Sequence, residues 1–196
     1  MATAGERGGR QRVFVALDLP EGVRGGLAVW GEAELVDPAL RPVRPESLHV
    51  TLVFLGHREA VEVERIAAVV AASGAPAPLL KLEDPISLPR GRRRASLFAL
   101  PAPSPATAEL RHRLVERLVA AGLHEPEERD FWPHLTVARV RAEGRGSRRP
   151  AAVERRPGDL PSGLKEPFLG VRMTLYRSEL QPRGARYVPL AQVELS

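Results

Sequence analysis

Apolar residues in the first part of the chain alternate between strand-like runs and helical spacing. The run VFVALDLP, residues 13–20, has the composition of a buried strand and ends at a proline. Over 21–35 apolar side chains recur every third or fourth position, which predicts a helix. A second strand-like run, LHVTLVFLG at 48–56, precedes another helical pattern over 60–72. Two consecutive strand–helix units are therefore predicted.

The middle of the chain predicts two more strands and a third helix. LLKLEDPISL (79–88) and RASLFALP (94–101) are strand-like and are joined by the arginine-rich turn PRGRRR. The helix that follows has an apolar stripe and is capped by Ser104 or Thr107, and Gly122 marks its end. The stripe consists of Leu110, Leu114, Leu118 and Val119.

The last part of the chain combines one strand, a basic loop and a terminal hairpin. PHLTVARV (133–140) is strand-like, whereas 141–166 is rich in Gly, Pro and Arg and predicts an exposed loop with one short helix. Two further strand-like runs close the chain. This order predicts an α+β fold with antiparallel or mixed sheets. We expect a flexible N-terminal segment over 1–11 and a single domain over 12–196.

Composition limits the possible classes of protein. The 196 residues suit one domain, and 43% are hydrophobic, as in folded globular proteins. The start MATAGERGGRQR lacks the apolar stretch of a secretory signal, and no run of about 18 uncharged apolar residues occurs. We therefore expect a cytoplasmic protein. The absence of cysteine excludes disulfides, thiolate metal ligands and a cysteine nucleophile.

The chain carries a net charge of +5, and almost all its basic residues are arginine. Arginine binds phosphate through two parallel hydrogen bonds, so an anionic partner is one interpretation; biased codon usage is the other. The arginines of the turn and of the basic loop are candidates for contact with an RNA backbone. They are Arg90, Arg92, Arg93, Arg94 and the arginines from Arg145 to Arg156.

Two of the strand-like runs carry a histidine followed two positions later by a threonine. Residues i and i+2 of a strand point to the same face, so His49 shares a face with Thr51, and His134 with Thr136. Either histidine alone is readily explained as a half-buried strand residue. The repetition of the pattern 85 residues apart instead suggests a duplication, in which each of two lobes gives one strand to a shared cleft.

Two imidazoles across a cleft suit cleavage of a phosphodiester by general acid–base catalysis. One imidazole accepts a proton from the nucleophile while the other gives a proton to the leaving oxygen, and a pKa near 6.5 makes both states accessible. Threonine hydroxyls donate hydrogen bonds to phosphate oxygens. Neither histidine has a second ligand at a usual metal-binding spacing. We therefore predict no metal and no cofactor.

These motifs resemble those of a known family. HVTL and HLTV resemble the paired signature of the 2H phosphoesterases; together with VFVALDLP, FWPHLTVARV and LYRSEL…G…Y, they resemble the bacterial and archaeal RNA 2′,3′-cyclic phosphodiesterases, also called 2′-5′ RNA ligases. The resemblance covers 12–196. It implies a bilobal fold with a central cleft and metal-independent opening of RNA 2′,3′-cyclic phosphates to 2′-phosphates. It also implies ATP-independent 2′-5′ joining of RNA, including tRNA fragments, and we expect a monomer.

The resemblance implies roles for six residues. His49 and His134 are catalytic, and Thr51 and Thr136 bind the phosphate. We assign His49 as general acid and His134 as general base, although the near-symmetry leaves the reverse open. The resemblance also places Arg139 at the substrate and Phe54 near the base, with core packing as the alternative for Phe54. Each lies five residues after its histidine, so each needs a bulge or twist to face the site.

Other classes remain open on the sequence alone. A non-catalytic RNA-binding module requires only a basic surface, but aromatic residues for base stacking make up just 5% of the chain. A 2H esterase for a small cyclic nucleotide or a 2′-5′ oligoadenylate keeps the same chemistry with a different substrate. A serine hydrolase is disfavoured because no Gly-x-Ser-x-Gly motif occurs.

Overall fold

The computed structural model describes residues 9–91, 94–125, 130–181 and 184–196. Residues 1–8 of the predicted N-terminal segment, and Arg92 and Arg93 of the predicted basic turn, lie outside these ranges. Among the described residues, no helix has the length and apolar character needed to cross a bilayer.

Most of the strands belong to one antiparallel sheet. In the described part of the chain its order is β10-β9-β1-β3-β7-β6-β5, with β2 also paired to β7 and with β4 and β8 forming a separate pair. The strands are β1 (Gln11–Asp18), β2 (Leu40–Pro42), β3 (His49–Arg58), β4 (Leu79–Leu80), β5 (Ile86–Leu88), β6 (Leu97–Pro101), β7 (His134–Val140), β8 (Phe168–Leu169), β9 (Arg172–Gln181) and β10 (Gly184–Glu194). The helices are α1 (Glu21–Glu34), α2 (Ala60–Ala71) and α3 (Pro105–Ala120), with 3₁₀ turns η1 (Pro45–Ser47) and η2 (Ser162–Lys165).

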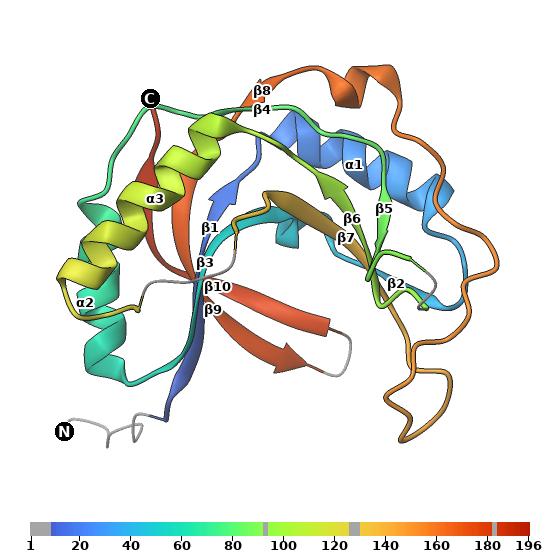
Figure 1. The fold of residues 1–196 in the computed structure, drawn as a ribbon, viewed down its shortest axis with the longest axis horizontal. Helices are drawn as coiled ribbons and strands as arrows, with labels where there is room; N and C mark the ends of the chain where they lie inside the picture. The colour runs from blue at the N-terminus through green and yellow to red at the C-terminus, as the bar shows by residue number, and fades with distance from the viewer. Residues whose placement is uncertain (1–8, 92–93, 126–129, 182–183) are drawn as a thin grey trace, which may run out of the picture.

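The sheet divides into two lobes where β3 meets β7 (Figure 1). These two strands pair at Val50 and Leu135 and then diverge. One lobe contains β10, β9, β1 and β3, and the other contains β7, β6, β5 and β2. The predicted bilobal α+β fold is confirmed, and all its paired strands within the described ranges are antiparallel.

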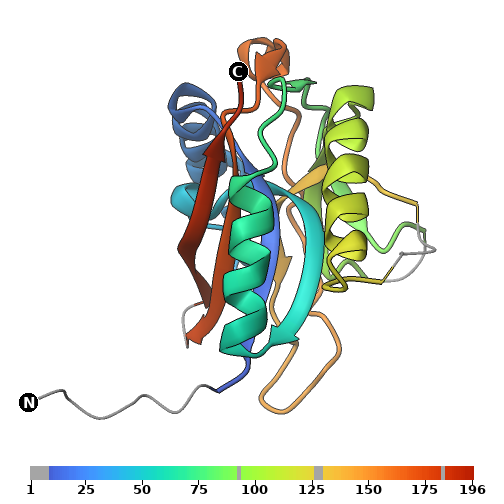
Figure 2. The same cartoon turned by 90° about the vertical axis from the view of Figure 1, so that its left-hand side faces the viewer.

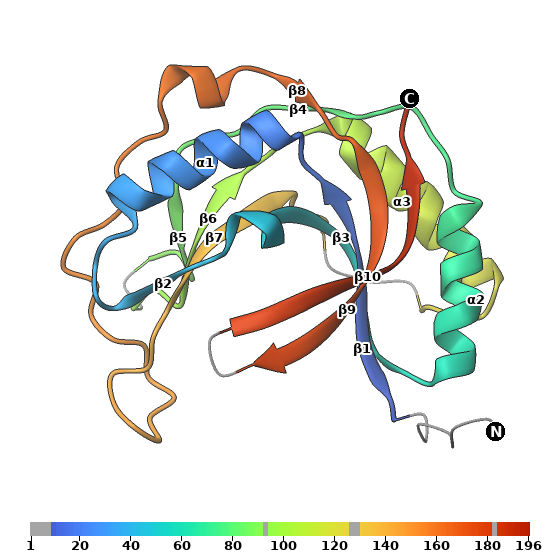
Figure 3. The ribbon, with the colours of Figure 1, turned by 180° about the vertical axis from the view of Figure 1, so that it is seen from behind.

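Helices cover the outer face of each lobe. Figure 2 shows α2 and α3 beside the first lobe, where α2 packs on β9 and β10 and α3 on β3. Helix α1 follows β1 in the chain but lies on the side of β5, β6 and β7 (Figure 3). Its buried residues Leu27 and Trp30 pack near Val137 of β7. The connection from β1 thus ties the two lobes together.

The predicted helices are confirmed, and their apolar stripes are buried. Leu110, Leu114 and Leu118 of α3 are buried, as burial of one face requires. Of the two predicted caps, Ser104 is the one used, because its Oγ accepts a hydrogen bond from the Thr107 backbone N–H at 3.1 Å. Gly122 follows α3 with a φ of 67°, a conformation that favours glycine.

One predicted strand is interrupted. Instead of a single strand over 79–88, β4 pairs with β8 and β5 pairs with β6. The segment between them contains Asp84, whose carboxylate binds Lys165 and the Leu160 backbone N–H. These side-chain bonds replace the ladder bonds of a continuous strand. The predicted short helix in the basic loop is η2, and the terminal hairpin is β9–β10.

Candidate active site

The two histidine strands bring all four motif residues to one face. Because β3 and β7 are antiparallel and pair at Val50 and Leu135, His49, Thr51, His134 and Thr136 point to the opposite face from this apolar pair. That face borders a central cavity of about 410 Å³. All six predicted site residues line it, namely His49, Thr51, Phe54, His134, Thr136 and Arg139.

A matching β-bulge in each strand turns Phe54 and Arg139 toward the central cavity. In β3, Leu52 is the extra residue, because Ala16 pairs with Thr51 but Val15 pairs with Val53. In β7, the extra residue lies between Thr136 and Ala138. An extra residue reverses the alternation of inward and outward side chains beyond it. Phe54 is 61% exposed, so it does not pack in the core.

Both histidines are oriented by the same kind of backbone contact. His49 Nδ1 lies 2.7 Å from the Ser47 carbonyl oxygen, and His134 Nδ1 lies 2.8 Å from that of Trp132. A carbonyl oxygen only accepts, so Nδ1 donates in each case. The nitrogen that remains for proton transfer is Nε2 of each ring. His49 Nε2 lies 3.1 Å from Thr51 Oγ1, which donates to it when the ring is neutral.

Burial holds His49 in its neutral form in the free protein. Removal from water lowers the pKa of His49 from 6.5 to about 4. The Ser47 carbonyl and the Asp18 carboxylate act in the opposite direction, whereas His134 and Arg139 lower the pKa further. An anion bound in the central cavity would favour the protonated ring, since opposite charges stabilise each other.

Aromatic rings contact both imidazoles. The Phe14 ring centroid lies 5.0 Å from that of His49, and Tyr187 meets His49 edge-on at 5.3 Å. On the other side, Trp132 stacks on His134 with a centroid distance of 4.2 Å. The sequence did not single out Phe14 and Tyr187, because aromatic residues in strands are also typical of a core, nor Trp132, which precedes β7.

Arginines give the central cavity a positive charge. Arg12, Arg41 and Arg44 line it together with Arg139, and no described Asp or Glu does. Within the described ranges, none of the four makes an ion pair with a carboxylate. Unpaired guanidinium groups facing one cavity favour an anionic ligand. The sequence signal for two of them was RPVRP, just before the first histidine motif.

The described arginines of the predicted basic turn and basic loop lie outside the central cavity. Arg94 binds the Glu143 carboxylate at 2.7 Å and the Pro150 carbonyl at 3.1 Å, so it fastens the basic loop. Arg149 also faces Glu143. Neither these residues nor Arg90 lines the central cavity. Their predicted contact with RNA stays a prediction, as it does for Arg92 and Arg93.

Among the described residues, no group of three or more His, Asp or Glu side chains is arranged to hold a metal ion.

Comparison with known proteins identifies the family. The chain is 35% identical to the RNA 2′,3′-cyclic phosphodiesterase of Thermus thermophilus, covering 94% of this chain and 90% of that protein. It is 27% identical to the Escherichia coli protein of the same name, covering 95% and 97%. The structure of Escherichia coli LigT complexed with 3′-AMP matches with a TM-score of 0.74 and 25% identity, covering 95% and 99%. The model of the 2′-5′ RNA ligase superfamily matches residues 27–160, and the chain therefore belongs to that superfamily.

Proposed function

We propose that this protein hydrolyses RNA 2′,3′-cyclic phosphate ends to 2′-phosphomonoesters by general acid–base catalysis with His49 and His134. The observation that carries the proposal is the pair of imidazoles on adjacent strands, each held through Nδ1 so that Nε2 remains for proton transfer at one cationic cavity. The names of the Thermus and Escherichia coli relatives support the same reaction.

The reaction requires one proton to be taken up and one to be released. His134 Nε2 accepts a proton from water as the water oxygen bonds to phosphorus. The bond from phosphorus to the 3′ oxygen breaks, and His49 Nε2–H donates a proton to that oxygen. The product carries a 2′-phosphate and a 3′-hydroxyl. Proton exchange with solvent then restores both rings.

Phosphate charge is balanced by donors from both lobes. Thr51 and Thr136 stand beside the histidines, where their hydroxyl groups are suited to donate to non-bridging oxygens. Arg139 adds a guanidinium on the same face. The negative phosphate also raises the pKa of His49 from its low value in the free protein, which supplies the proton needed by the acid.

The substrate is an RNA strand, including tRNA fragments, and not only a mononucleotide. Arg41 lies opposite Arg139 in the β2–β7 register, and Arg44 lines the same cavity. These additional cations are suited to phosphates upstream of the reacting end. Two exposed apolar side chains, Phe54 and Leu180, offer contact to the terminal base. A monomer would suffice, since one chain supplies both histidines.

The same geometry accommodates RNA joining. If the 5′-hydroxyl of a second RNA replaces water, its oxygen bonds to phosphorus and the 3′ oxygen leaves. A 2′-5′ phosphodiester results without ATP. The superfamily name supports this second reaction.

The test is to incubate the protein, with EDTA present, with a short RNA that ends in a 2′,3′-cyclic phosphate. We expect a 2′-phosphate product that is lost in His49→Ala and His134→Ala. His112→Ala is the matched control, because His112 is exposed on α3 and pairs with Glu116. Binding of the RNA with an intact ring would contradict the enzyme hypothesis and favour a binding module. Equal rates on RNA and on cyclic mononucleotides would favour a small-nucleotide esterase.

A further inference from the structure

Asp18 is a buried carboxylate directly beside the first histidine. It ends β1 and lies opposite His49 in the β1–β3 register, so both side chains belong to the same face of the sheet. Asp18 is only 4% exposed. A buried charge is costly unless it is paired and hydrogen-bonded. The structure around Asp18 supplies those partners.

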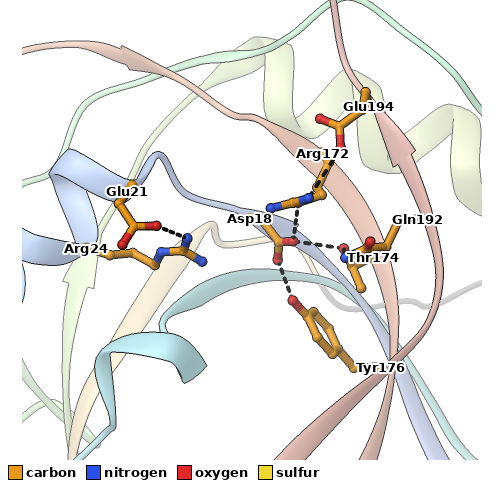
Figure 4. Close-up of polar contacts among 8 residues, drawn as sticks. All are labelled: Asp18, Glu21, Arg24, Arg172, Thr174, Tyr176, Gln192 and Glu194. Atoms are coloured by element: carbon orange, nitrogen blue, oxygen red, sulfur yellow. Dashed lines mark hydrogen bonds and ion pairs between the residues drawn. The ribbon is translucent and has the colours of Figure 1, made fainter.

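Strand β9 holds both oxygens of this carboxylate (Figure 4). Tyr176 donates its hydroxyl to Oδ1 at 2.9 Å, and Thr174 donates to Oδ2 at 2.8 Å. Arg172 Nε lies 3.2 Å from Oδ2, and Arg172 Nη1 lies 3.3 Å from Oε1 of exposed Glu194. Burial and the Asp18 charge raise the pKa of Tyr176 to about 12, so its hydroxyl keeps the donated proton. The carboxylate is therefore fixed in place.

Among the described residues, the position in the second lobe that matches Asp18 carries no carboxylate. Strand β6 pairs with β7 as β1 pairs with β3, and the residue opposite His134 is Pro101. The sheet therefore forms at the matching position without an acidic residue. Of the two histidines, only His49 thus has a carboxylate at the opposite register position. This difference gives the two imidazoles different electrostatic surroundings.

We propose that Asp18 is a positioning residue for His49. The Asp18 carboxylate stabilises the protonated imidazole and so makes His49 the general acid of the proposed reaction. The assignment of His49 as the general acid rests on the proposed function. The stabilisation itself does not depend on activity. It arises because a fixed negative charge beside the imidazole favours the cationic ring.

Other charged and titratable groups around His49 oppose or moderate this effect. His134 and Arg139 of β7 disfavour the cation, and burial acts in the same direction. Arg172 of β9 partly neutralises Asp18. Tyr176 and Tyr187 place neutral rings beside His49. Asp18 is the carboxylate among the described residues that acts in favour of the cation.

Because Asp18 and Arg172 carry opposite charges, removing each should shift the titration midpoint of His49 in opposite directions. NMR titration of the His49 ring is compared in wild type, Asp18→Asn and Arg172→Gln. We expect the midpoint to fall by about one pH unit in Asp18→Asn and to rise in Arg172→Gln. Glu194→Gln is the control, because it removes an exposed carboxylate of the same network on the far side of Arg172. Its midpoint should equal that of wild type.

A purely structural network predicts a different result. Loss of packing would move both midpoints in the same direction, and an unchanged midpoint in both variants would also overturn the proposal. If Asp18→Asn does not fold, the upward shift in Arg172→Gln still decides the question. These readouts are independent of catalysis, so an inactive enzyme would refute the proposed function without touching the titration result.

The pH dependence of activity then tests the assignment of His49 as the general acid. The alkaline limb of the pH–rate profile should move to lower pH in Asp18→Asn and to higher pH in Arg172→Gln. At pH 7 we expect Asp18→Asn to lose about tenfold in kcat, with KM nearly unchanged, because a lower pKa leaves less His49 protonated. Movement of the acid limb alone would make His49 the base and overturn this assignment.

Discussion

The β1–β3 half and the β6–β7 half of the molecule share one local design. In each half a histidine and a threonine face the central cavity, and an extra residue bulges from the motif strand after the threonine. In each, a backbone carbonyl two residues earlier accepts from the histidine Nδ1. The shared features are those needed to place two imidazoles and two hydroxyls around a single phosphate.

The halves differ in what surrounds this shared design. The first has Asp18 beside its histidine and Phe54 beyond the bulge, whereas the second has Pro101 and Arg139 at the matching positions. A symmetric pair cannot distinguish the attacking oxygen from the leaving oxygen. We therefore infer that the direction of the reaction and the fit of the substrate depend on the parts in which the two halves differ.

Substitution of the two histidines that the halves share should reduce activity most. His49→Gln and His134→Gln should each reduce kcat about 10³-fold, because each removes one proton-transfer group. The double variant should lose less than the product of the two, since acid and base act in one step. Single-turnover assays on cyclic-phosphate RNA measure this. Fully multiplicative losses would show that the two histidines act independently.

Substitution of the two shared threonines should cause the next largest loss of kcat. Thr51→Val and Thr136→Val each remove a hydroxyl but keep a similar shape, and each should cost about 10²-fold in kcat. Equal losses would support matching positions at one phosphate. A loss confined to one of them would place the phosphate in a single lobe. Circular dichroism of both variants controls for folding.

Substitutions of Arg139 and Phe54, the residues beyond the bulges, should have different kinetic effects. Arg139→Gln should raise KM about tenfold for all RNA ends, since it removes a phosphate contact. Phe54→Leu should change KM by an amount that depends on the terminal base, because base stacking differs among bases. Steady-state kinetics on RNAs with four different 3′-terminal bases separate the two. Base-independent effects of Phe54→Leu would argue against base contact.

The cavity arginines should have smaller effects, which depend on substrate length. Arg41→Gln and Arg44→Gln should each weaken binding of a short RNA a few-fold and reduce its salt dependence. They should leave a cyclic mononucleotide nearly unaffected. Arg113→Gln is the control, because Arg113 is exposed on α3, pairs with Glu109 and lies outside the central cavity. Equal effects on both substrates would place these arginines at the reacting phosphate instead.

The low pKa of His49 predicts that the stability of the protein depends on pH. Its pKa falls from 6.5 to about 4 on folding, so the unfolded chain takes up the proton first as pH decreases. Wild type should therefore lose up to about 3 kcal/mol of unfolding free energy between pH 6.5 and 4, relative to His49→Gln. Urea titrations at several pH values measure the difference. A constant difference would mean that His49 is not held neutral by burial.

The sequence predicted the two histidine motifs and the helices because both follow fixed local spacing. Residues two apart on a strand share a face, and one apolar helix face must be buried. The bulges that turn Phe54 and Arg139 inward were required but were not visible, because a bulge depends on the partner strand. Arg41 and Arg44 were missed because Arg41 lies in a three-residue strand, which is too short to show periodicity, and Arg44 lies in the short segment that follows it.

Asp18 illustrates the limit of local patterns most clearly. It lies within an apolar run and reads as the polar end of a strand. Its partners Thr174 and Tyr176 are 156 and 158 residues away in the chain. Only the sheet order β9-β1-β3 places them and His49 together. Such a network becomes visible only in the tertiary fold.

The monomeric state and the cytoplasmic location stay predictions.

NMR titration with adenosine 2′-phosphate decides whether both imidazoles face one phosphate. Ring signals of His49 and His134 should shift together along one binding curve, while exposed His112 does not move. Two separate curves, or a shift at only one of the two histidines, would contradict the arrangement of both imidazoles at one phosphate.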